Sequence, residues 1–273
     1  MPNNVFSLEG RVAVVTGSLG LLGRHHCLAL AEAGAHVVAT DLGGPDCKAF
    51  AAEISRSSSR DTLGLGVDVT KPDSVRSARD EILNHFGQID ILVNNAAIND
   101  MFENPAAAAE LSKFENYPLE LWQKSVDVNV TGVFLCSQIL GTEMAKRGKG
   151  SIINIASTYG IVAPDQSLYR RPDGSQNFYK SATYPTTKGA VIAFTRFLAT
   201  YWGRNGVRVN ALSPGGVENS QDEHFVQAYA AKTPLGRMAE PTDYKGAIVF
   251  LASDASCYMT GANLVVDGGW TSW

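Results

Sequence analysis

Tyr184 and Lys188 could perform acid–base chemistry, and they stand four positions apart in the segment Tyr-Pro-Thr-Thr-Lys. If a helix begins at Tyr184, the two side chains share one face of it. An ammonium group a few ångströms from a phenol favours the phenolate, so we expect Lys188 to lower the pKa of Tyr184 from its reference value of about 10. Such a tyrosine could donate or accept a proton near neutral pH. The same spacing is common in surface pairs, so the interpretation depends on neighbouring elements.

A serine stands at the end of the apolar run Asn154-Ile155-Ala156-Ser157. The run predicts a buried strand over 151–157, and a hydroxyl at its carboxyl end could hydrogen-bond a reacting oxygen. A serine that caps the next turn is the alternative. With Tyr184 and Lys188, Ser157 predicts proton transfer at the oxygen of an alcohol or a ketone.

A glycine-rich turn separates the first predicted strand, 11–16, from the first predicted helix, 19–33. Its glycines are Gly17, Gly20 and Gly23. Glycines let the backbone approach a pyrophosphate, and the helix N-terminus adds N–H donors and the positive end of a dipole. An ordinary turn with a helix cap is the alternative. The strand before and the helix after favour a dinucleotide site.

Asp41 ends the second predicted strand, 36–41. A carboxylate there can accept hydrogen bonds from the ribose hydroxyls of NAD and repel the 2′-phosphate of NADP. Leu42 follows, so no Lys or Arg stands there to hold that phosphate. Asp41 could instead be a turn residue before Gly43-Gly44. The sequence therefore predicts NAD as the cofactor.

Polar residues also end the third and fourth predicted strands. Asp68 ends strand 62–68 and could meet the adenine or cap the next helix. Asn94-Asn95-Ala96-Ala97 ends strand 90–94. Ligands of such sheets bind outside the carboxyl ends of the strands, so these asparagines suit a cofactor crevice. A loop cap is the alternative.

Apolar, β-rich runs alternate with longer amphipathic segments along the chain. Strands that are apolar almost throughout are typical of a parallel sheet with helices on both faces. Strand–helix alternation gives right-handed crossovers. We expect one α/β domain over 1–273, a Rossmann-type doubly wound sheet of about seven strands. The other elements expected are helices near 46–57, 72–86, 119–147 (in one or two pieces), 184–204 and 242–252, strands 207–212 and 263–267, and a loop over 98–118.

Composition and charge exclude several classes of protein. The chain has 273 residues, a formal net charge of −4 and no block of Lys and Arg, which argues against nucleic acid as a partner. The four cysteines form no Cys-x-x-Cys pair, so we expect free thiols in a reducing compartment and no metal site or disulfide. No signal peptide or membrane span is recognised. We expect a cytoplasmic protein that acts on a small molecule, with no membrane partner.

In their order along the chain, these motifs resemble those of the short-chain dehydrogenase/reductase family, in its classical single-domain form. The resemblance runs from Gly10 to Trp270 and includes Asn129, Pro214-Gly215 and Asp267-Gly268-Gly269. It implies an oxidoreductase with a nicotinamide cofactor. The protein would orient cofactor and substrate while the nicotinamide performs the hydride chemistry.

The resemblance also implies a role for each site residue. Tyr184 would donate or accept the proton at the substrate oxygen, Lys188 would lower its pKa and hold the nicotinamide ribose, and Ser157 would polarise the carbonyl. Asn129 would hold a water that links Lys188 to solvent; a polar group or kink inside a helix is the alternative. The Val217 backbone would contact the carboxamide, a tight turn being the alternative. The expected cofactor contacts are Gly17, Ser18, Gly20, Leu22, Gly23, Asp41, Leu42, Asp68, Val69, Asn95, Ala96, Ala97, Tyr184, Lys188, Pro214, Gly215, Val217 and Asn219.

Three features depart from the family pattern. A glycine expected at Leu21 falls instead at Gly20, a spacing typical of the extended branch, which mostly handles nucleotide sugars. The chain length and the terminal Asp-Gly-Gly argue against that branch. Asn219 stands where the family usually has threonine. Ser157 and Tyr184 are 27 residues apart, a longer gap than usual.

The extra residues form an insertion over about 158–183, next to the catalytic pair. Its polar and aromatic side chains suit a hydroxyl-rich ligand, and its Arg and Lys could bind a carboxylate, phosphate or sulfonate. A solvated loop or a subunit contact is the alternative. Residues 218–238 match the family's substrate lid, with surface helix packing as the alternative. The candidate substrate contacts are Arg170, Arg171, Lys180 and Phe225.

The tail Trp270-Thr271-Ser272-Trp273 is similar to those of family members that act on sugars, polyols and sugar acids. Exposed tryptophans would be unusual on a monomer, so we expect a homotetramer or at least a dimer. The leading hypothesis is an NAD-dependent dehydrogenase of a sugar, sugar acid or polyol, acting at a secondary alcohol, hemiacetal or ketone. The alternatives are a reductase or epimerase on a nucleotide-linked sugar and a non-catalytic NAD-binding protein. The intact catalytic set argues against the last.

Overall fold

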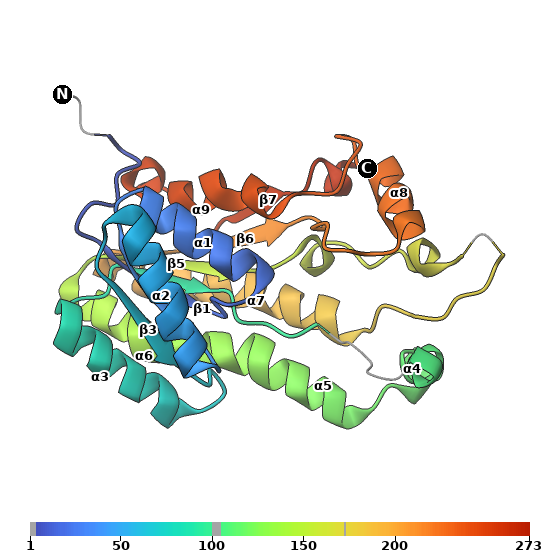
Figure 1. The fold of residues 1–273 in the computed structure, drawn as a ribbon, viewed down its shortest axis with the longest axis horizontal. Helices are drawn as coiled ribbons and strands as arrows, with labels where there is room; N and C mark the ends of the chain where they lie inside the picture. Colours follow the sequence, from blue (N-terminus) through green and yellow to red (C-terminus); the bar gives the residue numbers. More distant parts are fainter. Residues whose placement is uncertain (1–3, 100–104, 172) are drawn as a thin grey trace.

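One parallel sheet carries the strands of the chain in the order β3-β2-β1-β4-β5-β6-β7 (Figure 1). The computed structural model describes residues 4–99, 105–171 and 173–273. Within them the strands are β1 (Val12–Thr16), β2 (His36–Asp41), β3 (Thr62–Gly66), β4 (Ile91–Asn94), β5 (Gly150–Ile155), β6 (Val207–Pro214) and β7 (Asn263–Val266). The chain order reverses beside β1, between β2 and β4. Ligand sites of open parallel sheets lie at such a point, outside the carboxyl ends of the strands.

Helices cover both faces of the sheet. They are α1 (Leu21–Glu32), α2 (Gly44–Ser58), α3 (Pro72–Phe86), α4 (Pro105–Leu111), α5 (Leu119–Val126), α6 (Gly132–Arg147), α7 (Thr183–Trp202), α8 (Glu223–Lys232) and α9 (Lys245–Ala252). The core beneath α1 and α9 contains Val15 and Ile153, whereas the core beneath α3 and α6 contains Val14 and Ile152. Neighbouring residues of one strand therefore face opposite cores, which explains the nearly continuous apolar runs. The predicted doubly wound α/β sheet is confirmed.

The predicted helical segment 119–147 contains a π-helical turn. Asp127–Thr131 joins α5 to α6 with this wider turn, in which the Gly132 amide donates to the Asp127 carbonyl. Asn129 is buried within it. Single π turns inside helices are frequent at functional sites, and this one places Asn129 at the sheet edge that holds the predicted site.

Part of the predicted loop 98–118 is helical. α4 begins at Pro105 and continues through four alanines, and Phe114–Asn116 forms a 3₁₀ turn. Proline suits the first position of a helix and alanine has the highest helix propensity, so the signal was present in the sequence. The predicted loop also includes residues 100–104, which lie outside the described residues.

Three strands end earlier than predicted, and the smallest difference is at β7, which ends at Val266 instead of Asp267. β3 ends at Gly66, because the Asp68 carboxylate accepts hydrogen bonds from the backbone amide and hydroxyl of Thr70 and forms a turn. β5 ends at Ile155, so Ser157 lies just beyond the strand. Asp68 and Ser157 still follow the carboxyl ends of β3 and β5.

All four cysteines are free thiols; Cys27, Cys47 and Cys136 are buried and Cys257 is exposed. Across the residues that the structure describes, no group of three His, Cys, Asp or Glu side chains is arranged to hold a metal ion. None of the helices described has the length and apolar character needed to cross a membrane.

The buried His26 in α1 should make the folded state sensitive to acid. It is fully buried, and neither ring nitrogen has a partner within the described structure. Burial lowers the pKa of His26 to about 4, whereas the unfolded chain protonates near 6.5. Between about pH 6.5 and about pH 4 the unfolded state binds more protons than the folded state. The free energy of unfolding therefore decreases as the pH is lowered through this window. The loss attributable to His26 should be about 2 kcal/mol at pH 5.

Urea unfolding at pH 7.5 and pH 5.0, for the wild type and for His26→Leu, measures this contribution. We expect the loss of stability between the two pH values to shrink by about 2 kcal/mol in the variant. An equal loss in both proteins would contradict the role assigned to His26.

Candidate active site

The carboxyl ends of four neighbouring strands bring the predicted site residues together. Gly17 follows β1, Asn95 follows β4, Ser157 follows β5 and Gly215 follows β6. These residues line two adjoining cavities. The first, which we call the catalytic pocket, has a volume of about 400 Å³. The second, which we call the cofactor groove, has a volume of about 460 Å³. The two share Leu21, Leu22, Asn95, Ala97 and Ile98 as lining residues.

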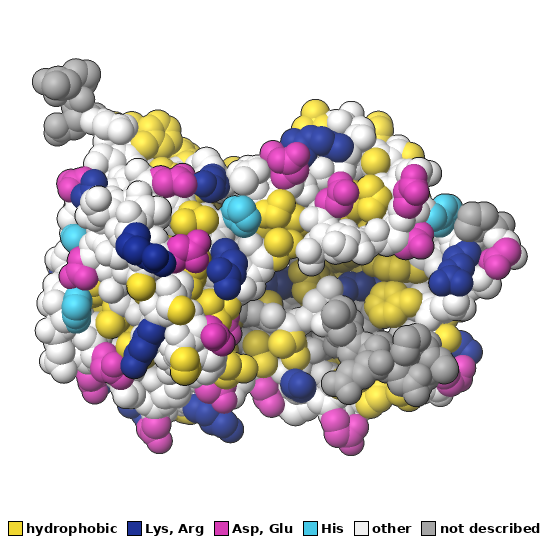
Figure 2. Space-filling view, viewed as in Figure 1, with side chains coloured by type: hydrophobic (Ala, Val, Ile, Leu, Met, Phe, Trp, Pro, Cys, Tyr) yellow, Lys and Arg dark blue, Asp and Glu magenta, His cyan; other side chains and the backbone are white. Residues whose placement is uncertain are grey.

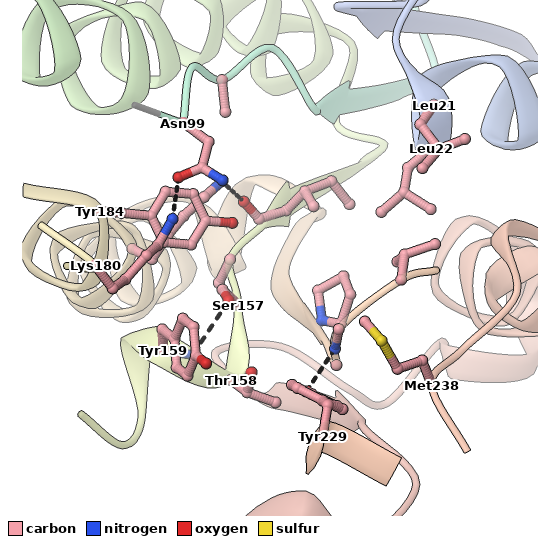
Figure 3. A pocket seen from close by; sticks show the side chains of 18 of the residues that line it. Leu21, Leu22, Asn99, Ser157, Thr158, Tyr159, Lys180, Tyr184, Tyr229 and Met238 are labelled. Atoms are coloured by element: carbon pink, nitrogen blue, oxygen red, sulfur yellow. Dashed lines mark hydrogen bonds between the residues drawn. The ribbon is translucent and has the colours of Figure 1, made fainter. Parts of the chain in front are cut away.

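Tyr184, Lys188 and Ser157 all line the catalytic pocket (Figure 3). α7 begins at Thr183, so Tyr184 and Lys188 lie on its first turns. The ammonium nitrogen of Lys188 is 5.7 Å from the centre of the Tyr184 ring and donates a 2.7 Å hydrogen bond to the Ile155 carbonyl. Strand β5 therefore positions both the serine and the lysine.

Ser157 fulfils the capping role that was its alternative, and it also faces the pocket. Its hydroxyl oxygen accepts a 3.1 Å hydrogen bond from the Tyr159 amide and caps the 3₁₀ turn Thr158–Gly160. The Ser157 hydroxyl also acts on the Tyr184 phenol, whose pKa it lowers against the larger effect of burial. The two roles are compatible, because the hydroxyl proton stays available to a second acceptor.

Burial sets the direction of both pKa shifts in the catalytic pair. It raises the pKa of Tyr184, opposed by the hydrogen bond with Ser157. It lowers the pKa of Lys188 to about 8. The pKa of Tyr184 therefore does not fall below its ordinary value in this structure, contrary to the expectation from the Tyr-Pro-Thr-Thr-Lys spacing. Desolvation of the phenolate outweighs an ammonium 5.7 Å from the ring.

Asn129 joins the loop after β4 to α7. Its side-chain oxygen accepts a 2.8 Å hydrogen bond from the Ile98 amide, and its amide group donates to the Ile98 carbonyl and to the Thr187 hydroxyl. Thr187 precedes Lys188, so this link holds the catalytic helix against the pocket wall. The water expected at Asn129 remains a prediction, and the side chain already has protein partners.

Two glycines make the turn at the cofactor groove possible. Gly17 has a φ of +62°, and a Cβ there would lie 2.7 Å from Ala96 Cα. A Cβ on Gly23 would lie 2.1 Å from the Gly17 carbonyl oxygen. No larger residue fits either position, so helix α1 can begin directly against the turn. α1 starts at Leu21 with Gly20 as its N-cap, which accommodates the unusual glycine spacing.

Asn95 fastens this turn to strand β4. Its side-chain amide donates 2.9 Å hydrogen bonds to the carbonyls of Thr16 and Gly17. Its backbone amide donates to the Thr16 hydroxyl. Asn95 therefore shapes the groove as well as lining it, and the geometry of the glycine turn depends on a residue far away in sequence.

Asp41 lies at the groove with its carboxylate directed at the glycine turn. One oxygen accepts a 3.0 Å hydrogen bond from the Leu19 amide and the other a 2.8 Å bond from the Leu42 amide. The cofactor groove is lined by the predicted residues Gly17, Gly20, Leu22, Gly23, Asp41, Leu42, Asp68, Val69, Asn95, Ala96 and Ala97. The catalytic pocket is lined by the predicted residues Leu22, Asn95, Ala97, Ser157, Lys180, Tyr184, Lys188, Pro214, Gly215, Val217 and Phe225.

Some predicted residues line neither cavity. Ser18 is fully buried under the turn, and Asn219 is exposed, with its backbone amide bonded to Gln221. Arg170 and Arg171 do not line the catalytic pocket, and Arg170 forms an isolated antiparallel bridge with Gln176 in a segment at one end of the molecule (Figure 1). The structure therefore brings Lys180, but neither arginine, to the pocket.

The insertion and helix α8 enclose the outer side of the pocket. Thr158, Tyr159, Tyr169 and Lys180 come from the insertion. From α8, the Tyr229 hydroxyl accepts a 2.7 Å hydrogen bond from the Gly216 amide. Figure 2 shows the molecule hollowed beside the carboxyl edge of the sheet, with Lys or Arg side chains visible inside the hollow.

The C-terminal tail supports this wall. Trp270 is only 8% exposed and stacks on Tyr229 with ring centres 4.0 Å apart. Trp273 is 81% exposed. The expectation of exposed tryptophans therefore holds for Trp273 only, because α8 and the insertion cover Trp270.

Several pocket residues were missed from the sequence. They are Asn99, Tyr159, Tyr169, Gln221 and Met238, whereas Tyr229 was expected as a possible pocket wall. Tyr159 stands two positions after Ser157, and Asn99 closely follows the Asn-Asn-Ala-Ala motif, so proximity in sequence could have indicated both. Gln221 and Met238 carry no individual signal, because only the folding of the segment around α8 over the sheet edge brings them to the pocket.

Known proteins resemble this chain over nearly its whole length. A family model described as enoyl-(acyl carrier protein) reductase matches residues 20–271. D-Threitol dehydrogenase of Mycolicibacterium smegmatis is 36% identical, over 97% of this chain and 95% of that protein. NAD-dependent glycerol dehydrogenase of Listeria innocua is 34% identical, over 97% and 96%. A gluconate 5-dehydrogenase from Burkholderia cenocepacia, solved with NADP and tartrate, is 33% identical with a TM-score of 0.86, over 99% and 98%.

Proposed function

The chain belongs to the short-chain dehydrogenase/reductase family, and from this premise we propose that it is a nicotinamide-dependent dehydrogenase of a sugar, sugar acid or polyol. The observation that carries the proposal is the convergence of Ser157, Tyr184 and Lys188 on a pocket that adjoins the cofactor groove. A secondary alcohol, hemiacetal or ketone would react there. Relatives named for threitol, glycerol and gluconate support this substrate class.

The groove residues fit a dinucleotide cofactor. The positions of Gly17 and Gly23 leave no room for a Cβ, and the adjacent N-terminus of α1 favours a pyrophosphate. Asp41 would accept hydrogen bonds from the ribose hydroxyls of NAD. Bound there, the nicotinamide would supply the hydride donor or acceptor.

The residues of the catalytic pocket would move the proton that accompanies hydride transfer. In the oxidative direction, the ionised Tyr184 oxygen takes the hydroxyl proton of the substrate while Ser157 donates a hydrogen bond to the same oxygen. In reduction Tyr184 returns the proton. Lys188 stabilises the ionised tyrosine and holds the nicotinamide ribose, and Asn129 keeps α7 in place through Thr187. We retain the water at Asn129 as part of the proposal.

The charges at the groove support NAD over NADP. Among the described residues that line it, the ionisable side chains are Asp41, Asp68 and Lys124. A 2′-phosphate next to Asp41 would meet a carboxylate and find no arginine among these residues. The Listeria relative is named NAD-dependent, whereas the Burkholderia structure contains NADP. The preference for NAD or NADP must therefore be argued from the residues that line the cofactor groove of each protein.

We propose that residues 218–238 form the substrate lid and that the insertion 158–183 completes the substrate wall of one domain, 1–273. Phe225 and Tyr229 from α8 and Tyr159 and Lys180 from the insertion support this, since all line the catalytic pocket. Arg170 and Arg171 would then act on substrate only if their segment moved toward the pocket.

A substrate panel followed by NADH absorbance tests the function. Aldoses, sugar acids, polyols and phosphorylated or sulfonated sugars are incubated with enzyme and NAD, then with NADP. Turnover of one of these classes with NAD supports the proposal. If no substrate of the panel is turned over although NADH binding is shown by fluorescence, the proposed substrate class is contradicted. Nucleotide-linked sugars would then be tested, followed by the non-catalytic hypothesis.

The protein is further proposed to be a homo-oligomer, a dimer or tetramer, joined through an aromatic surface on α6 and α7. Phe134, Phe197 and Tyr201 are 44%, 59% and 66% exposed. Phe197 stacks on Tyr201 at 5.8 Å and on Phe194 at 6.4 Å. An exposed aromatic patch of this kind marks an interaction site. The acidic charge and the free cysteines support action in the cytoplasm on a small molecule.

Charges placed on this surface should dissociate the oligomer. We expect the double variant Phe197→Glu/Tyr201→Glu to sediment at the monomer mass in analytical ultracentrifugation, because two carboxylates cannot be buried there unpaired. Phe114→Glu is the matched control, since Phe114 is 80% exposed on another part of the surface. A wild-type protein that already sediments as a monomer would contradict the proposal.

A further inference from the structure

A second ammonium group lies closer to the Tyr184 ring than that of Lys188. The ammonium nitrogen of Lys180 is 4.6 Å from the ring centre, whereas that of Lys188 is 5.7 Å away. Both lysines line the catalytic pocket. Lys180 stands four residues before Tyr184, just as Lys188 stands four residues after it. Two ammonium groups therefore lie near the tyrosine that we assign to proton transfer, and Figure 3 shows Lys180 beside Tyr184.

Lys180 is held in this position by contacts from two other parts of the chain. Its ammonium group donates to the side-chain oxygen of Asn99. The side chain of Gln166 bonds the Lys180 backbone twice, by accepting from its amide at 3.0 Å and donating to its carbonyl at 2.9 Å. Lys180 is only 8% exposed. These three hydrogen bonds therefore fix both its backbone and its ammonium group beside the ring.

The groups around Tyr184 provide few other charges. Ser157 comes from the end of β5 and Lys188 from α7. The remaining titratable side chains that line the pocket in the described chain are the phenols Tyr159, Tyr169 and Tyr229. No Asp, Glu, His or Arg side chain lines this pocket among the described residues. The phenols are neutral in the physiological range, and burial raises the pKa of Tyr159 and Tyr229 and raises that of Tyr169 to about 12.

Burial alone opposes ionisation of Tyr184, because desolvation raises its pKa. A cation near the ring has the opposite effect, since it favours the charged form. A cation over an aromatic face is also attracted to the ring itself, more strongly when it is desolvated. Two ammonium groups would offset the cost of burial better than one.

We propose that Lys180 is a positioning residue that acts through Tyr184, with its ammonium group stabilising the ionised phenol during proton transfer together with Lys188. The proposal rests on the proposed function, in that Tyr184 must be the acid–base group. It requires that Lys180 carry its charge in the working range of pH. It explains why the insertion, which supplies both Gln166 and Lys180, lies directly before the catalytic helix.

The first test is the pH profile of kcat/KM for oxidation in the wild type, Lys180→Met and Lys180→Arg. Methionine keeps most of the side-chain length and removes the charge, whereas arginine keeps the charge. We expect the acidic limb, which reports ionisation of Tyr184, to move up by about one pH unit in Lys180→Met. Lys180→Arg should restore most of the shift. An unchanged limb in Lys180→Met would overturn the proposal.

A second test needs no substrate. The ultraviolet absorbance of phenolate is titrated in each protein and in the same protein carrying Tyr184→Phe, and the difference isolates Tyr184. We expect the midpoint to rise by about one pH unit in Lys180→Met and to return in Lys180→Arg. This titration tests the role of Lys180 separately from the proposed dehydrogenase function, because the Tyr184 midpoint can be measured even if no substrate of the panel is turned over.

Retention of fold is checked by NADH fluorescence, since the cofactor groove does not include Lys180. If Lys180→Met binds NADH poorly, Lys180→Gln replaces it in both titrations. A raised KM for acidic substrates alone, with the Tyr184 midpoint unchanged, would overturn the proposal and identify Lys180 as a substrate contact instead.

Discussion

Replacement of Tyr184 with phenylalanine should lower kcat by at least about a thousandfold and leave NADH binding close to wild type. General acid–base catalysis contributes about 10² to 10⁴ in rate, and phenylalanine keeps the ring while it removes the hydroxyl group. The ring should still pack near the ammonium groups of Lys180 and Lys188, so the pocket should keep its shape. Steady-state kinetics and NADH fluorescence titration measure the two quantities.

Tyr159→Phe is the matched control for this variant. Tyr159 is also a partly buried phenol that lines the catalytic pocket, and it belongs to the turn capped by Ser157. We expect its loss to reduce kcat by less than about tenfold, because it takes no part in the proposed proton transfer. Near-wild-type turnover in Tyr184→Phe would refute the mechanism, whereas equal losses in both variants would show a general effect of removing a phenol.

The wild-type enzyme should prefer NAD over NADP by about a hundredfold in kcat/KM, and Asp41→Asn should remove most of this preference. A hydrogen bond to a charged group is worth about 1.5 to 3 kcal/mol, which corresponds to roughly ten- to a hundredfold. Repulsion of the 2′-phosphate adds to the discrimination. Asparagine keeps the shape and can still accept one backbone hydrogen bond, from Leu19 or Leu42. The change therefore removes the charge together with one of the two backbone hydrogen bonds.

Two further variants sharpen the cofactor test. Asp41→Asn combined with Leu42→Arg should favour NADP, because it adds a cation where Leu42 lines the groove. Asp46→Asn is the control, since Asp46 is an exposed carboxylate in the first turn of α2 that does not line the groove. Equal efficiency of the wild type with NAD and NADP would refute the assignment of Asp41.

Local sequence patterns were sufficient for the order of the strands and for the inner part of the site, although helices α4 and α8 were not among the predicted elements. Continuous apolar runs predicted the strands of a parallel sheet, and the chain alternates between such runs and helices. The glycine turn, Asp41, Asn95 and Ser157 each follow a strand, so a parallel sheet must bring them to one edge. Tyr184 and Lys188 share a helix face by spacing alone. These inferences depend only on neighbours within a few residues.

The electrostatics of the site depended on the tertiary structure. The sequence suggested that Lys188 lowers the pKa of Tyr184, but burial by segments from β5, the insertion and α8 raises it. A desolvation cost arises from everything that excludes water around a group, so no local spacing can indicate it. The same holds for His26, whose burial only the packed sheet reveals.

The choice among the candidate substrate residues was also made by the tertiary structure. Arg170, Arg171 and Lys180 are alike as cations in one polar insertion, and the sequence could not rank them. Neither arginine lines the catalytic pocket, while Gln166 and Asn99 hold Lys180 over the catalytic ring. The residue types and their order along the strands and helices set the chemistry that is available, and the long-range contacts decide which side chains reach the reacting atoms.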